Sequence, residues 1–322
     1  MANLTGTHNL RDTDPSSDDA PTALTFVKVT YYTIASVVAM IGNGLLITTV
    51  VRRYTLRKVS YFLVANLAFK DFAFALVSTV FTMPSVFKDR WMFGHHLCVM
   101  FGFISTWLAY VELLTLVCLA SDRYVAVTRP LRYHQILSRN KFRGAVAFCW
   151  SYSFLWAALP LVGFGEYVYY DNLKICQLNW SPGLIRQIYV YGVGSLLFFP
   201  GTGMIIYCYI NVYRRAKSII DVPVFTVQTQ ANGNKSKRTG SRGTKATFTI
   251  ALITGIYFFC WFPFVGVRLT EIYYPGYKDD ITLQALENFT IYSFTIANFI
   301  NPIIYGIYNK EFRHELFKLI RR

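Results

Sequence analysis

The sequence predicts an all-α membrane protein, a seven-transmembrane helix bundle followed by a short amphipathic helix. Three observations predict this class. The 322-residue chain is 54% hydrophobic and 15% charged, and its mean hydropathy of +0.34 is too apolar for an ordinary soluble domain. Seven mostly apolar stretches reach the roughly 20 residues that cross a bilayer as a helix. Basic residues gather in alternate connections between these stretches.

The seven stretches lack the polar face of a soluble helix. A helix on the surface of a soluble protein alternates polar and apolar residues at a period of 3.6, whereas charges here are few and most fall near the ends. The predicted spans are residues 26–51, 61–84, 98–120, 144–164, 188–212, 246–269 and 283–307. Prolines predict kinks or local openings at Pro84, Pro160, Pro200, Pro263 and Pro302.

The charges of the connections predict the orientation. Basic clusters follow the first, third, fifth and seventh spans, whereas residues 1–25 carry four aspartates. The positive-inside rule then places the N-terminus outside and the C-terminus in the cytoplasm, and we expect a multi-pass protein of the plasma membrane. The net charge of +15 would face anionic inner-leaflet lipids, which argues against binding to nucleic acid.

Outside the spans we expect a polar tail, a polar loop and one short helix. Residues 1–25 form an extracellular tail without the apolar core of a signal peptide, and Asn3 opens an Asn-x-Thr glycosylation site. Residues 26–308 form the seven-helix domain, in which the polar loop 218–244 cannot build a core and is expected to be disordered. Residues 309–322 form an amphipathic helix on the inner membrane surface.

Two of the six cysteines are expected to form a disulfide. Cys98 opens the third span and Cys176 precedes the fifth, both at outer positions, and the outside of a cell is oxidising. The bridge would tie the second outer loop over the mouth of the bundle. The other four cysteines lie within spans, where cysteine behaves as a small apolar residue.

Polar residues inside the spans predict a mid-membrane cluster. Its members are Asn43, Asp71, Glu112, Asn298 and Asn301. Two carboxylates in low-dielectric surroundings cannot both ionise cheaply, so one should hold a proton or both should bind a cation. We therefore expect a sodium or proton site, and otherwise a permanently protonated Glu112 that makes one hydrogen bond. No cofactor is expected beyond a possible sodium ion.

A charged triplet ends the third span. Arg123 follows Asp122 and precedes Tyr124, and an arginine at the rim of a membrane helix is costly unless it has a partner or a polar cavity. At about 100° per residue, Ser105, Glu112 and Arg123 fall on one stripe of the helix. We expect this stripe to face the interior of the bundle.

Six motifs occur in order, each on a different span. They are Gly42-Asn43, Leu67-Ala68-x-x-Asp71, Asp122-Arg123-Tyr124, Trp150, Cys260-Trp261-Phe262-Pro263 and Asn301-Pro302-Ile303-Ile304-Tyr305. Through them, the chain from Phe26 to Arg322 resembles the rhodopsin-like (class A) G-protein-coupled receptors. The resemblance implies a receptor, not an enzyme, that transmits ligand binding to heterotrimeric G proteins, with arrestin and receptor kinases as further partners.

The resemblance also implies roles for single residues. Arg123 would pair with Asp122 at rest and reach the G protein when the sixth helix swings outward. Trp261 would lie beneath the ligand and shift with it, and Tyr305 would support the open state. Gly243 stands where many members carry an acid that latches the arginine, so we expect appreciable ligand-independent activity. The other residues expected in the switch are Tyr124, Tyr209, Tyr257 and Pro302.

The second outer loop resembles that of opsins, through Tyr167-Val168 and the segment Gln177 to Trp180. Opsins bind retinal covalently through a lysine in the seventh span, but Thr295 stands at that position. The two places where opsins keep a counterion are Phe101 and Tyr170. A covalent retinal pigment is therefore not expected, and an opsin-type photopigment or a non-covalent retinoid binder remains the alternative function.

The candidate ligand pocket lies in the outer half of the bundle. An aromatic pocket with few charges suits a small, mostly apolar ligand with one or two polar handles. Ser105 replaces the aspartate of amine receptors, so an amine is not expected, and a peptide receptor or a transporter is a less favoured alternative. Arg268 and Glu287 would either pair with each other or meet a charged ligand. The candidates are Ser105, Tyr110, Trp261, Phe264, Arg268, Glu287, Ile291 and Thr295.

Overall fold

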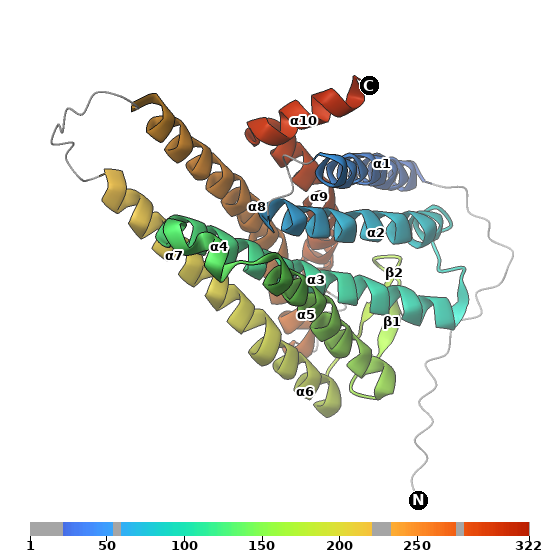
Figure 1. Ribbon diagram of the computed structural model, residues 1–322. Helices are drawn as coiled ribbons and strands as arrows, with labels where there is room; N and C mark the ends of the chain where they lie inside the picture. Colours follow the sequence, from blue (N-terminus) through green and yellow to red (C-terminus); the bar gives the residue numbers. More distant parts are fainter. Residues whose placement is uncertain (1–21, 54–58, 221–232, 275–279, 322) are drawn as a thin grey trace, which may run out of the picture.

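The computed structural model describes residues 22–53, 59–220, 233–274 and 280–321 (Figure 1). The described elements are almost all helices, which confirms the predicted class. In chain order they are α1 (Ala23–Arg52), α2 (Val59–Phe87), α3 (Gly94–Thr128), η2 (Pro130–Arg132), α4 (Tyr133–Ile136), α5 (Arg139–Ala158), η3 (Leu159–Val162), β1 (Tyr167–Tyr170), β2 (Ile175–Leu178), α6 (Leu184–Val193), η4 (Gly194–Phe198), α7 (Phe199–Ile220), α8 (Gly233–Tyr273), α9 (Ile281–Tyr308) and α10 (Lys310–Ile320).

The long helices pack into one bundle around α3, which contacts α2, α5, α7 and α8 as well as both strands (Figure 1). The segments α6, η4 and α7 follow one another without a break, and η4 is a single π-helical turn between the two α-helices. We call the end of the bundle that carries β1 and β2 the outer end. The opposite end, where α10 contacts α1 and α9, is the inner end.

Side-chain caps set several helix boundaries. The Thr22 hydroxyl accepts a hydrogen bond from the Thr25 backbone N–H at the start of α1, and the Asp280 carboxylate accepts two at the start of α9. The Asn309 side chain accepts one from the Phe312 N–H, which starts α10 directly after α9. Each cap satisfies backbone donors that the first turn of a helix leaves without partners.

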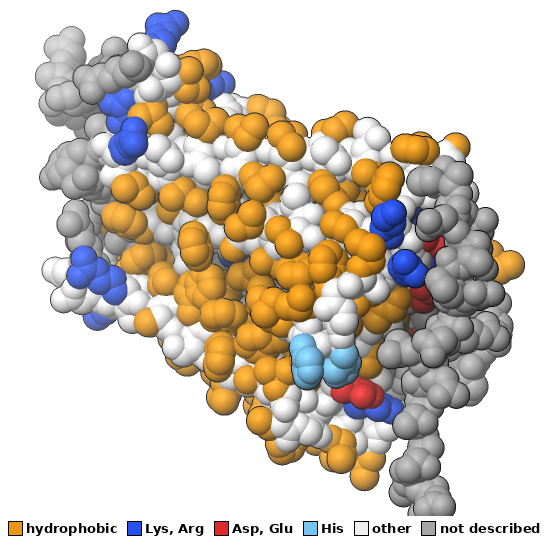
Figure 2. Space-filling model, turned by 90° about the vertical axis from the view of Figure 1, so that its right-hand side faces the viewer, with side chains coloured by type: hydrophobic (Ala, Val, Ile, Leu, Met, Phe, Trp, Pro, Cys, Tyr) orange, Lys and Arg blue, Asp and Glu red, His pale blue; other side chains and the backbone are white. Residues whose placement is uncertain are grey.

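The surface of the bundle is apolar, as a lipid-facing surface requires. Phe199, Phe259 and Phe262 are each more than half exposed, whereas Asp71 and Thr115 are fully buried. Hydrophobic side chains cover the middle of the face shown in Figure 2. Within the described residues, six helical segments have the length and apolar composition to cross a membrane. The seventh predicted span corresponds to α9 (Ile281–Tyr308), which is not one of these six segments.

The helices at the inner end run further than the sequence predicts. The loop 218–244 was expected to be disordered, but α7 continues to Ile220 and α8 begins at Gly233; residues 221–232 lie outside the described part. Once a membrane helix exists, adding residues to its end is much easier than nucleating a new helix, so polar residues can continue it. The predicted amphipathic helix is α10, in which Phe312 is buried.

A two-stranded antiparallel hairpin covers the outer end, and its strands are not among the elements predicted from the sequence. Tyr167 pairs with Leu178 and Tyr170 with Ile175. The predicted disulfide joins Cys98 at the start of α3 to Cys176 in β2. The hairpin also packs closely on α3, because a Cβ at Gly102 would lie 2.7 Å from the ring of Tyr167. The hairpin is thereby held as a cover over the bundle.

Candidate functional site

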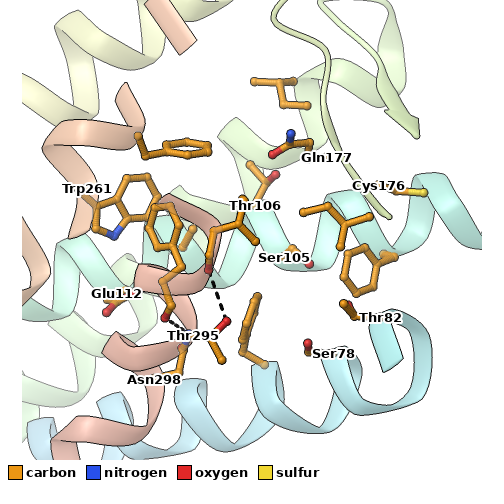
Figure 3. A pocket seen from close by; sticks show the side chains of 18 of the residues that line it. Ser78, Thr82, Ser105, Thr106, Glu112, Cys176, Gln177, Trp261, Thr295 and Asn298 are labelled. Carbon is orange, nitrogen blue, oxygen red and sulfur yellow. Dashed lines mark hydrogen bonds between the residues drawn. The ribbon is translucent and has the colours of Figure 1, made fainter. Parts of the chain in front are cut away.

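A cavity of about 160 Å³ lies beneath the hairpin, between α2, α3, α8, α9 and β2. Its walls are largely aromatic and aliphatic, and Trp261 and Phe264 from α8 meet Phe294 from α9 there with ring centroids 4.7–5.8 Å apart. Figure 3 shows Ser105, Trp261 and Thr295 around the same space. Concave, mostly apolar sites of this kind bind small molecules in many proteins.

Six of the eight residues predicted to form the ligand pocket line this cavity. They come from α3, α8 and α9, whose inner faces converge beneath the hairpin. The six are Ser105, Tyr110, Trp261, Phe264, Ile291 and Thr295.

The other two predicted pocket residues, Arg268 and Glu287, do not line the cavity. The Arg268 guanidinium pairs with the carboxylates of Glu271 and Glu287, with 2.7 Å between Nη1 and Glu271 Oε2. It lies over the rings of Tyr170 and Phe264, 5.0 and 5.2 Å from their centroids. Arg268 is fully buried, and a buried charge is tolerated only when it is paired. Of the two expected arrangements, Arg268 and Glu287 therefore pair with each other and do not wait for a charged ligand.

We call Arg268, Glu271 and Glu287 the outer charge cluster. Asn172, in the hairpin turn, donates a hydrogen bond to Glu287, and the Tyr170 hydroxyl donates one to Glu271 at 3.0 Å. Burial, and then the negative charge of Glu271, raise the pKa of Tyr170 above its ordinary value, so its hydroxyl stays a donor. The cluster fastens the hairpin to the outer ends of α8 and α9.

Three polar atoms in the cavity wall are buried without a hydrogen-bond partner among the described residues. They are the Ser105 Oγ, the Gln177 Nε2 and the Trp261 Nε1. Buried polar groups in native proteins nearly always have a partner. A polar handle of a ligand in this cavity would therefore find a partner at these three atoms.

A lysine outside the set of predicted site residues lies at the floor of the cavity. Lys70, in α2, is only 2% exposed, and its Nζ lies 2.6 Å from Asp71 Oδ1. The same ammonium donates to Glu112 Oε2 at 2.9 Å and to Asn298 Oδ1 at 3.0 Å. The signal was present in the sequence, as a lysine beside an aspartate inside a long apolar stretch.

We call Lys70, Asp71 and Glu112 the floor charge cluster, because Lys70 and Glu112 line the cavity. Figure 3 shows Glu112 and Asn298 at one side of the space, away from Cys176. The expected sodium or proton site thus already contains a positive charge. The five residues predicted for this site lie together around it, either beside Lys70 or one hydrogen bond away.

Hydrogen bonds connect the floor charge cluster to α1 and to the lower part of α9. The Asn301 side-chain amide donates to Asp71 Oδ2 at 2.7 Å. The Asn43 amide donates to the Asn298 carbonyl oxygen at 3.0 Å. In the next turn of α9, Pro302 packs on Gly42, where a Cβ would lie 2.7 Å from Pro302 Cγ. This close approach requires a glycine in α1, since any side chain would push the two helices apart.

At the inner end, Arg123 pairs with its neighbour Asp122, with Nε 2.9 Å from Asp122 Oδ2. Ser60 and Tyr133 also donate to Asp122, at 2.8 and 2.6 Å. Burial, and then the charge of Asp122, raise the pKa of Tyr133 to about 12, so this hydroxyl remains a donor. Arg123 is 9% exposed, and Asp122 therefore neutralises it within the bundle.

The remaining predicted switch residues lie on α3, α7, α8 and α9. The ring of Tyr257 lies 5.4 Å from that of Trp261, and the Tyr209 hydroxyl is 3.1 Å from Thr254 Oγ1. Tyr305 is buried, and its hydroxyl has no hydrogen-bond partner among the described residues. Tyr124 packs against Tyr207. All four of the predicted tyrosines belong to or pack against one buried hydrophobic cluster that Trp261 also contacts.

The sequence matches the family described as 7 transmembrane receptor (rhodopsin family) over residues 42–305. It is 25% identical to melanopsin of Branchiostoma belcheri over 293 residues, which cover 87% of this chain and 40% of that protein. It is 26% identical to opsin-5 of Homo sapiens, covering 95% of this chain and 84% of that protein. Identity to the octopamine receptor beta-1R of Drosophila melanogaster is also 26%, with coverage of 96% and 64%.

The fold is similar to that of squid rhodopsin, with a TM-score of 0.85 and 21% sequence identity. The superposition covers 96% of this chain and 88% of that one. At this identity the likeness concerns the arrangement of the helices. The chain spans less than half of the length of the melanopsin.

Proposed function

Since this chain belongs to the rhodopsin family of seven-transmembrane receptors, we propose that its cavity binds a small, mostly apolar ligand. The chain is a G-protein-coupled receptor and a multi-pass membrane protein that couples to G proteins. The proposal concerns what this receptor detects and how the cavity passes the signal on.

The composition of the cavity wall is the observation that carries the proposal. Aromatic and aliphatic side chains supply most of the wall, and the buried Ser105 hydroxyl and Trp261 indole N–H lack partners among the described residues. The arginine of the outer charge cluster is neutralised by its own carboxylates. A ligand with an apolar body and one or two hydrogen-bonding groups would complement this wall.

The aromatic contacts suggest how binding reaches the G protein. A ligand that moves Trp261 would also move Tyr257 and Phe294, whose rings pack on it. Tyr257 belongs to α8, so its displacement would favour an outward movement of the inner end of α8. Arg123 would then leave Asp122 and contact the G protein. Ligand and G protein would each favour the same conformation of the bundle, as allosteric coupling requires.

A non-covalent retinoid binder is the second candidate. The similarity to melanopsin and opsin-5 favours it, and an aromatic cavity beneath a hairpin would accommodate a polyene. Among the residues that line the cavity, the lysine is Lys70, whose ammonium lies between two carboxylates. A protonated amine is not a nucleophile, so we expect no covalent adduct with a retinal aldehyde.

We further propose that the receptor lies in the plasma membrane with its N-terminus outside and with Asn3, which lies outside the described residues, glycosylated. The basic connections and α10 would contact anionic lipids of the inner leaflet. Arrestin and receptor kinases are the proposed partners after activation. Peptide-N-glycosidase treatment and antibody access to a tag before residue 22 on intact cells would test the glycan and the orientation.

The test of ligand class is a screen of small apolar alcohols, acids, ketones and retinoids, read as guanine-nucleotide exchange on a panel of G proteins in purified membranes. A true ligand should lose potency at least about 10-fold in Ser105→Leu, which fills the cavity. Phe259→Ala, which changes a lipid-facing side chain two residues from Trp261, is the matched control. A ligand whose potency is unchanged by Ser105→Leu would contradict binding in this cavity.

A further inference from the structure

We propose that Lys70 is a tethered cation that permanently occupies the mid-membrane cation site, so that this receptor needs no diffusible sodium ion there. The inference does not depend on the identity of the ligand. It rests on the floor charge cluster and on the two asparagines that extend it along α9.

The ammonium group of Lys70 lies in a cage of oxygen atoms. Lys70 Nζ is surrounded by three oxygen atoms, at 2.6 Å from Asp71, 2.9 Å from Glu112 and 3.0 Å from Asn298. The Lys70 and Asp71 side chains are 2% and 0% exposed. Carboxylate and amide oxygens are the ligands that a hard metal cation takes in proteins. The ammonium therefore occupies the position that a bound metal ion would require.

The two carboxylates of the floor charge cluster require a positive charge beside them. Asp71 and Glu112 are two carboxylates in low-dielectric surroundings, and such a pair needs a proton or a cation. Lys70 supplies that cation from within the chain. A sodium ion entering the same oxygen cage would lie within a few ångströms of the ammonium, and the repulsion of two positive charges is weakly screened inside a protein.

The covalent attachment of the ammonium to α2 distinguishes it from a diffusible ion. A diffusible ion leaves its site at a rate and to an extent that depend on its concentration, whereas the Lys70 side chain cannot leave α2. The cluster joins three helices, since Lys70 and Asp71 belong to α2, Glu112 to α3 and Asn298 to α9. Asn301 adds a second bond from α9 to Asp71. The ammonium thus ties α9 to α2 and α3 at every salt concentration.

The contacts that join α9 to α2 and α3 lie directly beneath the cavity. Lys70, Glu112 and Asn298 all line the floor, so the deep end of a bound molecule would touch the same groups. Movement of α9 relative to α2 requires Asn298 and Asn301 to leave their partners. The tethered cation would therefore set the resistance to that movement, in place of an ion whose occupancy varies.

The experiment measures the melting temperature of the purified full-length receptor in lipid nanodiscs. Sodium chloride is exchanged for choline chloride at constant ionic strength. We expect the wild type to melt at the same temperature throughout. Lys70→Ala removes the ammonium and leaves two facing carboxylates with space between them. It should melt lower in choline, and saturating sodium should restore about 5 °C. Potassium at the same concentration should restore less.

Two further variants separate ion binding from general destabilisation. Lys70→Ala combined with Glu112→Gln lacks one of the carboxylates, so its sodium-dependent rise should be much smaller than that of Lys70→Ala. Lys310→Ala removes an exposed lysine and should behave as the wild type does.

Two results would overturn the proposal. One is a saturable, sodium-specific rise in the wild type as large as that of Lys70→Ala. The other is a folded Lys70→Ala protein whose melting temperature ignores sodium. If Lys70→Ala does not fold, the wild-type titration still decides whether sodium binds beside the lysine, and Lys70→Ser, which also leaves the space open and adds a hydroxyl oxygen, decides whether sodium binds in its absence.

Discussion

The outer charge cluster and the floor charge cluster have the same charge composition, one cation and two carboxylates, but opposite relations to the cavity. Arg268 is fully buried between Glu271 and Glu287, away from the cavity wall. Lys70 lies between Asp71 and Glu112 and lines the cavity floor. Charge composition alone therefore does not tell whether a buried ion cluster supports the fold or lies within reach of a ligand.

The cation type and the neighbours account for the difference. The planar guanidinium of Arg268 binds two carboxylates while its face packs on Tyr170 and Phe264. Asn172 and Tyr170 then attach the hairpin to the same carboxylates. Lys70 is a point charge that is held by groups on three helices. The outer cluster fastens a cover, whereas the floor cluster connects helices that a receptor must move.

Arg268→Ala should have the largest effect on stability. It leaves Glu271 and Glu287 buried without their cation, and breaking a buried ion cluster costs about 3–5 kcal/mol in the free energy of unfolding. Unfolding of the purified receptor in nanodiscs measures the loss. Lys318→Ala, which removes a half-exposed partner of Glu315, is the control and should change stability by less than about 1 kcal/mol. Equal losses in the two variants would contradict a structural role for the outer cluster.

Replacing both Cys98 and Cys176 by serine should have the next largest effect, a loss of about 2–4 kcal/mol. The disulfide holds the hairpin that carries Asn172 and Tyr170 onto the outer cluster. Its removal should therefore be non-additive with Arg268→Ala and additive with Glu112→Gln, since only contacting sites couple strongly. Additivity in both combinations would show that the hairpin and the outer cluster are energetically independent. Cys118→Ser, at a free cysteine, controls for thiol loss.

Glu112→Gln and Glu287→Gln should separate the two clusters by function. Each variant keeps the size of the side chain and one ion pair, so each should cost only about 1–3 kcal/mol of stability. Glu112→Gln should change ligand-independent G-protein activation by about 3-fold or more, because it loosens the connection between α2, α3 and α9. Glu287→Gln should leave this activity unchanged. The measurement is nucleotide exchange at matched surface expression, and a change of the same size in both variants would remove the distinction.

Gly243→Glu should have the smallest effect of these variants. It tests whether a second acidic partner for Arg123 at the inner end lowers ligand-independent signalling. An acid at this position would offer Arg123 a second partner in the resting state, in addition to Asp122. A single added ion pair at the cytoplasmic rim is taken to contribute about 1 kcal/mol, so ligand-independent signalling should fall by about 2–5-fold. Gly243→Ala makes the same change in helix propensity without the charge. A fall of equal size in the alanine variant would assign the effect to the helix backbone.

Local properties of the chain were sufficient to predict the helices and much of the candidate site. Residues 98–120 were predicted as a span and form the core of α3, and the pairing of Cys98 with Cys176 followed from the compartment at which each end lies. Ser105 and Thr295 were placed correctly at the cavity. Each of these predictions depends on composition or on spacing along one helix.

The errors concern groups whose partners lie on other elements. Arg268 and Glu287 were named as pocket residues that either pair with each other or meet a charged ligand, and only the assembled α8 and α9 decide for the pairing. Lys70 was overlooked because its partners Glu112 and Asn298 are 42 and 228 residues away. The strands of the hairpin were not predicted, since a pair of four-residue strands carries little signal of its own.

The sequence by itself determined the long membrane-spanning helices, their order and the class of the protein, whereas the tertiary structure alone decided which buried charges meet. A helix in a bilayer satisfies its backbone hydrogen bonds within one segment, so its existence can be deduced from the residues of that segment. The contacts of Lys70 and Arg268 depend on the rotation and packing of several helices at once. Whether a lysine beside an aspartate reaches a glutamate on α3 becomes known only when the helices are assembled.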